Sequence, residues 1–361
     1  MDADECPFAA GHDEVPPRVA GREIVFDAID QLMTDLATES PSEALVLASL
    51  PGGGRTAVLR QAPPLVPDNW KVISVDGVGL AAGAVAGAAL DALVADLAAD
   101  DPDAPAPKLA KAALDSERAA ILAGRAEAIT NVTAALALAV AVSGRGRMLL
   151  VDDLDGQDTA AHDAVIEGLG AGSARGLPLG AVITTIVDPA LVGRGRVVDL
   201  PPLSLFDLEN AVLLPAATLG RPVTTDALQA ISLHSEGHPW LIQALMAGSW
   251  TPPGEPITGA SINQRVPVAQ AAYRSAMIDP GLAALSSGAI RYLRAVATAD
   301  VVTHSSVSQG LGDSNRFGAS SDSALGHTRD ELRRVGLLRS VDGDTLRLPL
   351  PGLRLRLLAD L

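Results

Sequence analysis

The apolar residues between positions 44 and 200 alternate between short unbroken runs and longer stretches with helical spacing. Unbroken runs are typical of strands covered on both faces, whereas recurrence at every third or fourth position is typical of helices. The runs predict strands at 44–48, 70–76, 149–153, 177–185 and 194–200. The spacing predicts helices at 24–36, 77–99, 127–143 and 160–169. This alternation predicts an α/β fold in which helices flank both faces of a parallel sheet.

The pattern changes after position 200. Residues 204–250 have helical spacing throughout, apart from a break at Gly237-His238-Pro239. The Pro-rich segment 250–256 has the composition of a linker. The last part predicts helices at 286–297 and 328–335, followed by two short strands around Asp342-Gly343. Helices followed by a terminal hairpin predict a winged-helix domain.

Length and composition limit the possible classes of protein. A chain of 361 residues is long enough for two or three domains with a substantial core. It is 48% hydrophobic but only 2% aromatic, so the core must consist mainly of Ala, Leu and Val. The net charge of −16 argues against nucleic-acid binding over the whole surface, because such a surface repels phosphates.

Residues with metal-binding or redox chemistry are sparse. The single cysteine, Cys6, excludes an internal disulfide framework and a cysteine-based zinc cluster. The pair His234 and His238 is interrupted by Gly237, so we expect no metal site there. The acidic N-terminus predicts no secretory signal. The apolar stretch 129–142 is shorter than the ~18 residues of a membrane span, and we expect a cytoplasmic protein without a membrane partner.

The most informative stretch is a glycine turn after the first predicted strand. Gly52, Gly53 and Gly54 follow that strand, and Arg55-Thr56 opens a helical stretch. Phosphate-binding loops have this layout, since backbone N–H groups and a helix N-terminus surround the anion. The signature Gly-x-x-x-x-Gly-Lys-[Ser/Thr] is matched at only two of its four fixed positions, because Ser49 replaces the first glycine and Arg55 the lysine. A glycine-rich turn without a ligand is the alternative interpretation.

A second informative stretch is the strand that ends in Asp152 and Asp153. In open α/β sheets ligands bind at the carboxyl ends of strands. We therefore expect these carboxylates near the glycine turn if both strands are central. The strand at 177–185 likewise ends in polar residues, Thr184 and Thr185. The alternative interpretation of the acidic stretch is a turn that caps the following helix.

Taken together, these stretches resemble the AAA+ P-loop ATPases of the origin-recognition and archaeal-ATPase type, a group that overlaps the signalling NTPases called STAND. The resemblance covers residues 18–361. It rests on the order of Val19-Ala-Gly-Arg-Glu23, Ser49–Thr56, Leu149–Asp153, Thr184-Thr185, Leu200–Ser204, Gly237-His-Pro239 and Val335-Gly-Leu-Leu338. It implies a flexible tail 1–17, a P-loop α/β domain 18–203, a helical lid 204–250, a linker 251–282 and a winged-helix domain 283–361.

The resemblance also implies a site for ATP and Mg²⁺. Thr56 and Asp152 would hold the metal, and Arg55, Asp153 and Thr185 would be the catalytic residues. In these roles Asp153 orients the attacking water, and Thr185 or Thr184 is the polar sensor. The nucleotide would be contacted by the box Val19, Gly21 and Arg22, the loop Pro51, Gly52, Gly53, Gly54, Arg55, Thr56 and Ala57, and the lid residues Gly237 and Pro239.

Three departures from the family pattern predict weak catalysis. A planar guanidinium at Arg55 does not fill the place of a compact lysine ammonium. Ser49 loses the backbone freedom of glycine. Asp153 is one methylene shorter than the usual glutamate, and misplacing a catalytic group by about 1 Å can cost about 10²-fold in rate. We expect slow or absent hydrolysis, while nucleotide binding survives through backbone amides and Mg²⁺.

Three hypotheses for function follow. In the first, a regulatory protein uses Mg-ATP as a structural or switching ligand. In the second, a nucleotide-free pseudo-ATPase adaptor binds a protein partner, or a second copy of itself. In the third, the winged helix binds DNA. Residues 283–361 carry a net charge of +2 against −18 for the remainder. A solvated helix face explains their local basicity equally well; the arginines concerned are Arg329, Arg333, Arg334 and Arg339.

Overall fold

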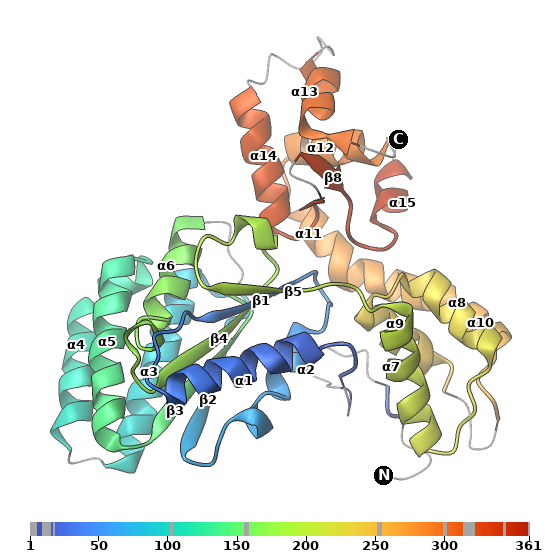
Figure 1. Cartoon of the computed structure of the whole chain (residues 1–361). Helices are drawn as coiled ribbons and strands as arrows, with labels where there is room; N and C mark the ends of the chain where they lie inside the picture. The colour runs from blue at the N-terminus through green and yellow to red at the C-terminus, as the bar shows by residue number, and fades with distance from the viewer. Residues whose placement is uncertain are drawn as a thin grey trace. The chain divides into compact units, whose positions relative to one another are not determined.

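A computed structural model of the chain is shown in Figure 1. It describes residues 6–8, 16, 19–101, 104–154, 159–250, 255–298, 302–312, 322–341 and 344–359. The chain divides into two compact units. We call residues 23–49 and 58–200 the sheet unit, and residues 1–22, 50–57 and 201–361 the helical unit.

The sheet unit is built around five parallel strands in the order β2-β3-β4-β1-β5. The strands are β1 (Leu45–Ser49), β2 (Trp70–Asp76), β3 (Gly146–Asp152), β4 (Leu179–Thr185) and β5 (Arg196–Leu200). The three central strands β3, β4 and β1 are buried almost throughout, because helices cover both faces. The predicted parallel sheet flanked by helices is therefore confirmed.

Helices pack against both faces of this sheet (Figure 1). Helix α1 (Glu23–Ala37) contacts β1, β4 and β5, and Gly180 leaves room for Leu36 of this helix. The helices α3 (Ala82–Asp100), α5 (Ala126–Ser143) and α6 (Thr159–Leu169) contact β2, β3 and β4. Helix α4 (Pro105–Leu122) packs on α3 and α5. Alternate strand residues such as Val46, Leu149 and Ala181 join the core beneath these four helices.

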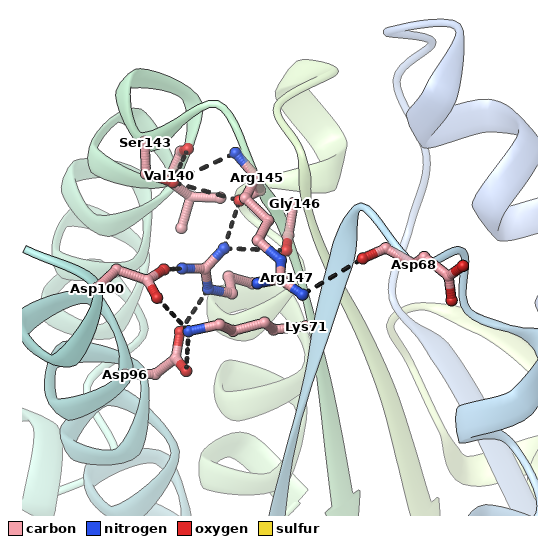
Figure 2. A network of polar contacts seen from close by, with 9 residues as sticks. All are labelled: Asp68, Lys71, Asp96, Asp100, Val140, Ser143, Arg145, Gly146 and Arg147. Atoms are coloured by element: carbon pink, nitrogen blue, oxygen red, sulfur yellow. Dashed lines mark hydrogen bonds and ion pairs between the residues drawn. The ribbon is translucent and has the colours of Figure 1, made fainter.

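A charged network fastens α3 to the amino ends of β2 and β3 (Figure 2). The fully buried Arg147 donates from Nε to Asp96 at 2.5 Å, and its Nη2 bonds Asp100. Lys71, which pairs with Arg147 across the two strands, bonds both aspartates as well. The hydrogen bond from Lys71, aided by Arg147, holds the pKa of Asp100 below its ordinary value. This network stabilises the sheet edge at the end opposite to the carboxyl termini of the strands.

Two helices in the described part of the chain, α3 and α5, are long and apolar enough to cross a membrane by length and composition. About half of each helix is buried inside the sheet unit. Core helices pass the same length and composition test, so packing on the sheet accounts for their apolar character.

The helical unit contains two apolar clusters. One lies among α7 (Leu205–Thr218), α8 (Thr225–Ser235), α9 (Pro239–Gly248) and α10 (Gly259–Tyr273). The other lies among α11 (Asp279–Ala283), α12 (Ser287–Ala297), α13 (His304–Gly312), α14 (Asp322–Arg334) and α15 (Leu353–Leu358). A small antiparallel sheet, β6-β8-β7, accompanies the second cluster; its strands are β6 (Val302–Thr303), β7 (Arg339–Ser340) and β8 (Thr345–Arg347).

Two segments differ from the sequence-based expectation, and a third lies outside the described residues. The segment 251–282, predicted as a linker, holds helix α10, which buries Ile262 and Ala269 against the lid helices. A π-helix, Arg274–Ile278, continues it. In the segment 1–17, predicted as a flexible tail, Phe8 is buried and its ring lies 5.6 Å from that of Trp250. The turn Asp342-Gly343 lies outside the described residues.

Candidate nucleotide-binding site

The sheet order brings the polar strand ends of the sheet unit to one edge. Strand β4 lies between β3 and β1, and all three run parallel. Thr185, the last residue of β4, is in register with Ala48 of β1. Asp152 ends β3, and Ser49 ends β1. This is the edge at which open α/β sheets bind ligands.

Asp152 is held by the hydroxyl of Thr184. Thr184 Oγ1 donates to Asp152 Oδ1 at 2.6 Å and accepts the backbone N–H of Asp153 at 2.8 Å. The carbonyl of Thr184 accepts the N–H of Leu154. Asp153 has a φ of +53°, which is uncommon for a residue other than glycine. The hydroxyl therefore fixes both carboxylate-bearing residues at the point where the chain leaves the strand.

The neighbouring hydroxyl, Thr185 Oγ1, has different partners. It accepts the N–H of Val187 at 3.2 Å and lies 3.2 Å from Nε2 of His162 on α6. Both threonines and His162 are buried. Because successive strand residues point to opposite faces, Thr184 and Thr185 serve separate partners. Of the two sensor candidates, Thr184 is the one bonded to Asp152.

In the helical unit, residues 50–54 form a tight turn that leads into α2 (Arg55–Arg60), and we call residues 50–57 the glycine loop. Gly52 and Gly54 have φ angles of +69° and +91°, which the absence of a Cβ permits. The N–H of Gly53 bonds the carbonyl of Leu50 at 2.9 Å. The N–H groups of Gly52 and Gly54 have no hydrogen-bond acceptor in the described part of the chain. Backbone N–H groups without an acceptor in a turn of this kind suit an anion.

Two buried side chains hold the glycine loop from outside. Arg22 donates from Nη2 to the carbonyl of Gly53 at 3.2 Å. His238 Nε2 lies 2.9 Å from the carbonyl oxygen of Pro51. A carbonyl can only accept, so Nε2 must carry the proton. Both side chains come from segments that the sequence assigns to the same site, the N-terminal box and the lid.

His238 is buried in a mainly apolar environment. Its ring packs edge-to-face on Tyr273 at 4.8 Å, and its Nδ1 has no hydrogen-bond partner among the described residues. Burial lowers the pKa of His238 to about 4, the bond to Pro51 opposes this shift, and the charge of Arg22 adds to it. The imidazole is therefore neutral at physiological pH.

Gly21 in the N-terminal box and Gly237 in the lid have close neighbours that leave no space for a side chain. A Cβ on Gly21 would lie 2.6 Å from the Asp207 side chain, and one on Gly237 would lie 2.3 Å from the carbonyl oxygen of Leu203. The N–H of Leu203 also donates to the carbonyl of Gly237 at 2.8 Å. A Cβ on Gly54 would lie 3.9 Å from that of Pro239. Within the helical unit, box, loop and lid thus come together.

The predicted site residues are divided between the two units. Asp152, Asp153 and Thr185 belong to the sheet unit. The remaining predicted residues belong to the helical unit: Val19, Gly21, Arg22, Pro51, Gly52, Gly53, Gly54, Arg55, Thr56, Ala57, Gly237 and Pro239. Arg55 begins helix α2 (Arg55–Arg60) and is largely buried. The convergence of the glycine loop with the twin aspartates stays a prediction.

The donor set suits Mg-ATP better than it suits a transition metal. Among the described residues no group of three or more His, Cys, Asp or Glu side chains could hold a metal ion. Mg²⁺ prefers a few oxygen ligands together with phosphate oxygens and water. Thr56 in the helical unit carries a hydroxyl, and Asp152 in the sheet unit carries a carboxylate, and each is an oxygen ligand of this kind. The unpaired N–H groups of Gly52 and Gly54 suit phosphate oxygens. The residues present therefore fit the group that the resemblance implies.

The contacts of two histidines, His238 and His162, could not be predicted from the sequence. His238 is bonded to a residue 187 positions away, so spacing gave no signal for it beyond its place between Gly237 and Pro239. His162 has no motif around it. Its contact with Thr185 follows from the packing of α6 beside β4.

No protein-family model matches the sequence, and no curated protein matches it. Solved structures, by contrast, match along nearly the whole chain. The ORC2 protein of Aeropyrum pernix, in its ADP form, is 14% identical over 97% of this chain and 96% of that one, with a TM-score of 0.52. A Walker-type ATPase of Pyrococcus abyssi is 12% identical over 95% of this chain and 99% of that one, with a TM-score of 0.58. The chain therefore shares the fold of these two archaeal proteins, which agrees with the predicted resemblance to origin-recognition and archaeal ATPases; the likeness at these identities is one of fold.

Proposed function

We propose that this chain is an ATP-binding AAA+/STAND-like regulatory protein that uses Mg-ATP as a structural or switching ligand, with weak or no hydrolysis. The observation that carries the proposal is the glycine loop. Its carbonyls are engaged by Arg22 and His238, while the N–H groups of Gly52 and Gly54 are left without acceptors in the described structure. A loop in this state is suited to bind phosphate oxygens.

In this proposal Gly52, Gly54 and Arg55 contact the phosphates, and Thr56 and Asp152 hold Mg²⁺. Bound Mg²⁺ would neutralise phosphate charge. The carboxylate of Asp152 is kept in place by Thr184, and Thr185 is the candidate polar sensor. Val19, Gly21 and Arg22 would lie beside the adenine together with Gly237 and Pro239. The expected location is cytoplasmic, without a membrane partner.

Catalysis is the weak part of this site, for reasons that the sequence already indicates. Arg55 and Asp153 both depart from the residues that the reaction needs. Asp153 also holds a backbone conformation with φ of +53°, so its short side chain starts from a restricted position. A nucleotide that binds and stays acts as a switch or a structural ligand.

Calorimetric titration with Mg·ATP and with ADP tests the proposal. We expect binding of at least one nucleotide, and a thermal shift that corresponds to about 2.7 kcal/mol at about 100 times Kd. Thr56→Ala and Asp152→Ala should abolish the dependence of nucleotide affinity on Mg²⁺. Absence of binding of both nucleotides at millimolar concentration would remove the proposal.

A nucleotide-free adaptor is the second candidate, and the substitutions Ser49, Arg55 and Asp153 favour it. Its partner would be another protein or a second copy of this chain. This candidate predicts that ATP does not raise the melting temperature of the wild type, of Thr56→Ala or of Asp152→Ala. The first candidate predicts that ATP raises the melting temperature of the wild type and raises it less in both variants.

DNA binding has weaker support. The order of α12, β6, α13, α14 and the antiparallel pair β7-β8 supports the expected winged helix. However, Arg333 and Arg339 are buried, and Arg329 and Arg333 both lie beside Asp330, at 2.9 and 3.6 Å. Arginines in these positions are poorly placed to neutralise phosphates. A gel shift of the full chain that weakens with salt would favour DNA binding.

A further inference from the structure

The glycine loop is held by two side chains that reach it from different parts of the sequence. His238 precedes α9, and Arg22 precedes α1; both side chains are almost completely buried. His238 bonds the carbonyl of Pro51, and Arg22 bonds the carbonyl of Gly53. Gly52 lies between the two captured carbonyls.

The captured carbonyls determine where the free N–H groups point. In a trans peptide the C=O of one residue and the N–H of the next point in opposite directions. The bond from His238 to the Pro51 carbonyl therefore turns the N–H of Gly52 away from His238. In the same way, the bond from Arg22 turns the N–H of Gly54 away from Arg22. The only loop N–H engaged between them, that of Gly53, closes the turn on Leu50.

The fit around Gly52 leaves little freedom for a different arrangement. A Cβ on Gly52 would lie 3.0 Å from Cε1 of His238 and 3.2 Å from both Met277 Sδ and Trp240 Cβ. These atoms come from the start of α9 and from the π-helix after α10. His238 is in turn fixed by the Tyr273 ring. A displacement of α9 would therefore change the orientation of the Pro51–Gly52 peptide.

We propose that His238 is a positioning residue. Its hydrogen bond to Pro51, which we call the latch, holds the start of α9 to the glycine loop. Together with Arg22 it orients the N–H groups of Gly52 and Gly54 for an anion before any ligand binds. The latch is a property of the protein without ligand. Its consequence for nucleotide affinity rests on the proposed function. Through this contact the position of α9 controls whether the loop is ready to bind.

Three variants of the full chain separate the hydrogen bond from simple packing. His238→Gln keeps a donor close to the position of Nε2, His238→Leu fills similar space without a donor, and His234→Gln is the matched control. His234 lies in the last turn of α8 and bonds Asn263 instead of the loop. The reporter is amide hydrogen exchange of residues 50–57 without nucleotide, above all the Gly53 N–H that bonds Leu50.

We expect exchange of the Gly53 amide to be about fivefold faster in His238→Leu than in the wild type, the change that the loss of one hydrogen bond brings. His238→Gln and His234→Gln should stay close to the wild type. A long-range ¹H–¹⁵N spectrum should show His238 as the neutral Nε2–H tautomer. Equal exchange in His238→Leu and the wild type, or an Nδ1–H tautomer, would overturn the latch.

Titration of the same variants with Mg·ATP tests the consequence for binding. If the wild type binds, His238→Leu should raise Kd by about the same factor as it raises exchange, and His238→Gln should restore the affinity. A wild type that binds no nucleotide refutes the proposed function, while the exchange experiment still decides on the latch. A wild type that binds, with an unchanged Kd in His238→Leu, refutes the presetting of the N–H groups.

Discussion

The hydroxyl of Thr184 donates to the carboxylate of Asp152 at 2.6 Å and accepts the N–H of Asp153 at 2.8 Å. One side chain at the end of β4 thus fixes the conformation of the chain at the end of β3. The two strands are neighbours, and their pairing places residues 32 positions apart within hydrogen-bond distance. The proposed metal ligand owes its orientation to this contact.

Thr184→Val should lower the free energy of unfolding by about 1–3 kcal/mol, because the buried N–H of Asp153 loses its acceptor. It should also weaken the effect of Mg²⁺ on nucleotide binding. Thr218→Val is the control: Thr218 is exposed on α7 and bonds a carbonyl of its own helix, so its loss should change stability by less than about 0.5 kcal/mol. Chemical denaturation of both variants provides the comparison.

Gly52→Ala should be more destabilising than Gly220→Ala, although the two glycines have nearly equal φ angles of +69° and +68°. At both positions alanine incurs the strain of a left-handed backbone, about 1–2 kcal/mol. Only at Gly52 would the Cβ also meet His238, Met277 and Trp240, because nothing lies within 4 Å at Gly220. Thermal denaturation should show the larger loss for Gly52→Ala, and equal losses would contradict the tight fit.

Stability should fall on acidification because of His238. Its pKa is about 4 in the folded protein and 6.5 in the unfolded chain. Between these values the unfolded chain binds a proton that the folded protein does not, so the free energy of unfolding decreases as the pH falls. The loss is about 2 kcal/mol at pH 5, rises to about 3 kcal/mol as the pH falls further, and becomes constant below pH 4. When urea unfolding is measured from pH 7 to 5, the free energy of unfolding should decrease less steeply with falling pH in His238→Gln than in the wild type. In His234→Gln it should decrease as steeply as in the wild type.

Arg147→Met should destabilise the protein by about 2–4 kcal/mol, since Arg147 is fully buried and its loss leaves Asp96 and Asp100 with Lys71 alone. Arg118→Met is the comparison. Arg118 likewise bonds two aspartates, Asp91 at 2.8 and 2.9 Å and Asp115 at 3.3 Å, but on an exposed surface. Exposed pairs contribute about 0–1 kcal/mol. Similar losses in the two variants, measured by denaturation, would show that burial is not the deciding factor.

Arg55→Lys combined with Asp153→Glu should raise ATP turnover. The first change restores a compact charge in the loop and the second restores the reach of the usual carboxylate. Turnover is measured as phosphate release, and the double variant with Asp152→Ala added serves as the control for contaminating ATPases. Nucleotide binding without a gain in turnover would show that the defect lies elsewhere in the site.

The sheet could be predicted from sequence because its strands are buried on both faces and appear as unbroken apolar runs. Strand β2 coincides with the predicted 70–76, and β4 begins two residues later than predicted. The same logic failed for α10. Its apolar residues follow no clear helical spacing, Pro267 lies inside it, and its capping box uses Thr258 and Ser261 instead of a glutamate, so the sequence gives little sign of a helix.

The candidate site could be predicted only as separate motifs. The residue types of box, loop and lid are visible in the sequence, but the bonds among them are not. Arg22 and Gly53 are 31 positions apart, and His238 and Pro51 are 187 apart. Spacing along the chain carries no information about such pairs. The preference of Asp152 for Thr184 over Thr185 likewise depends on which face each strand residue occupies.

The polypeptide passes between the two units four times, at residues 22–23, 49–50, 57–58 and 200–201. No single cut therefore releases either unit whole. A fragment that begins at residue 201 would lack Leu50, which belongs to the same apolar cluster as Leu241 and Tyr273. A fragment that ends at residue 200 would keep the glycine loop but lose His238, which holds its Pro51 carbonyl. Loss of nucleotide binding in a truncated protein would then report damage at the cut, and single substitutions in the intact chain are the way to assign its parts.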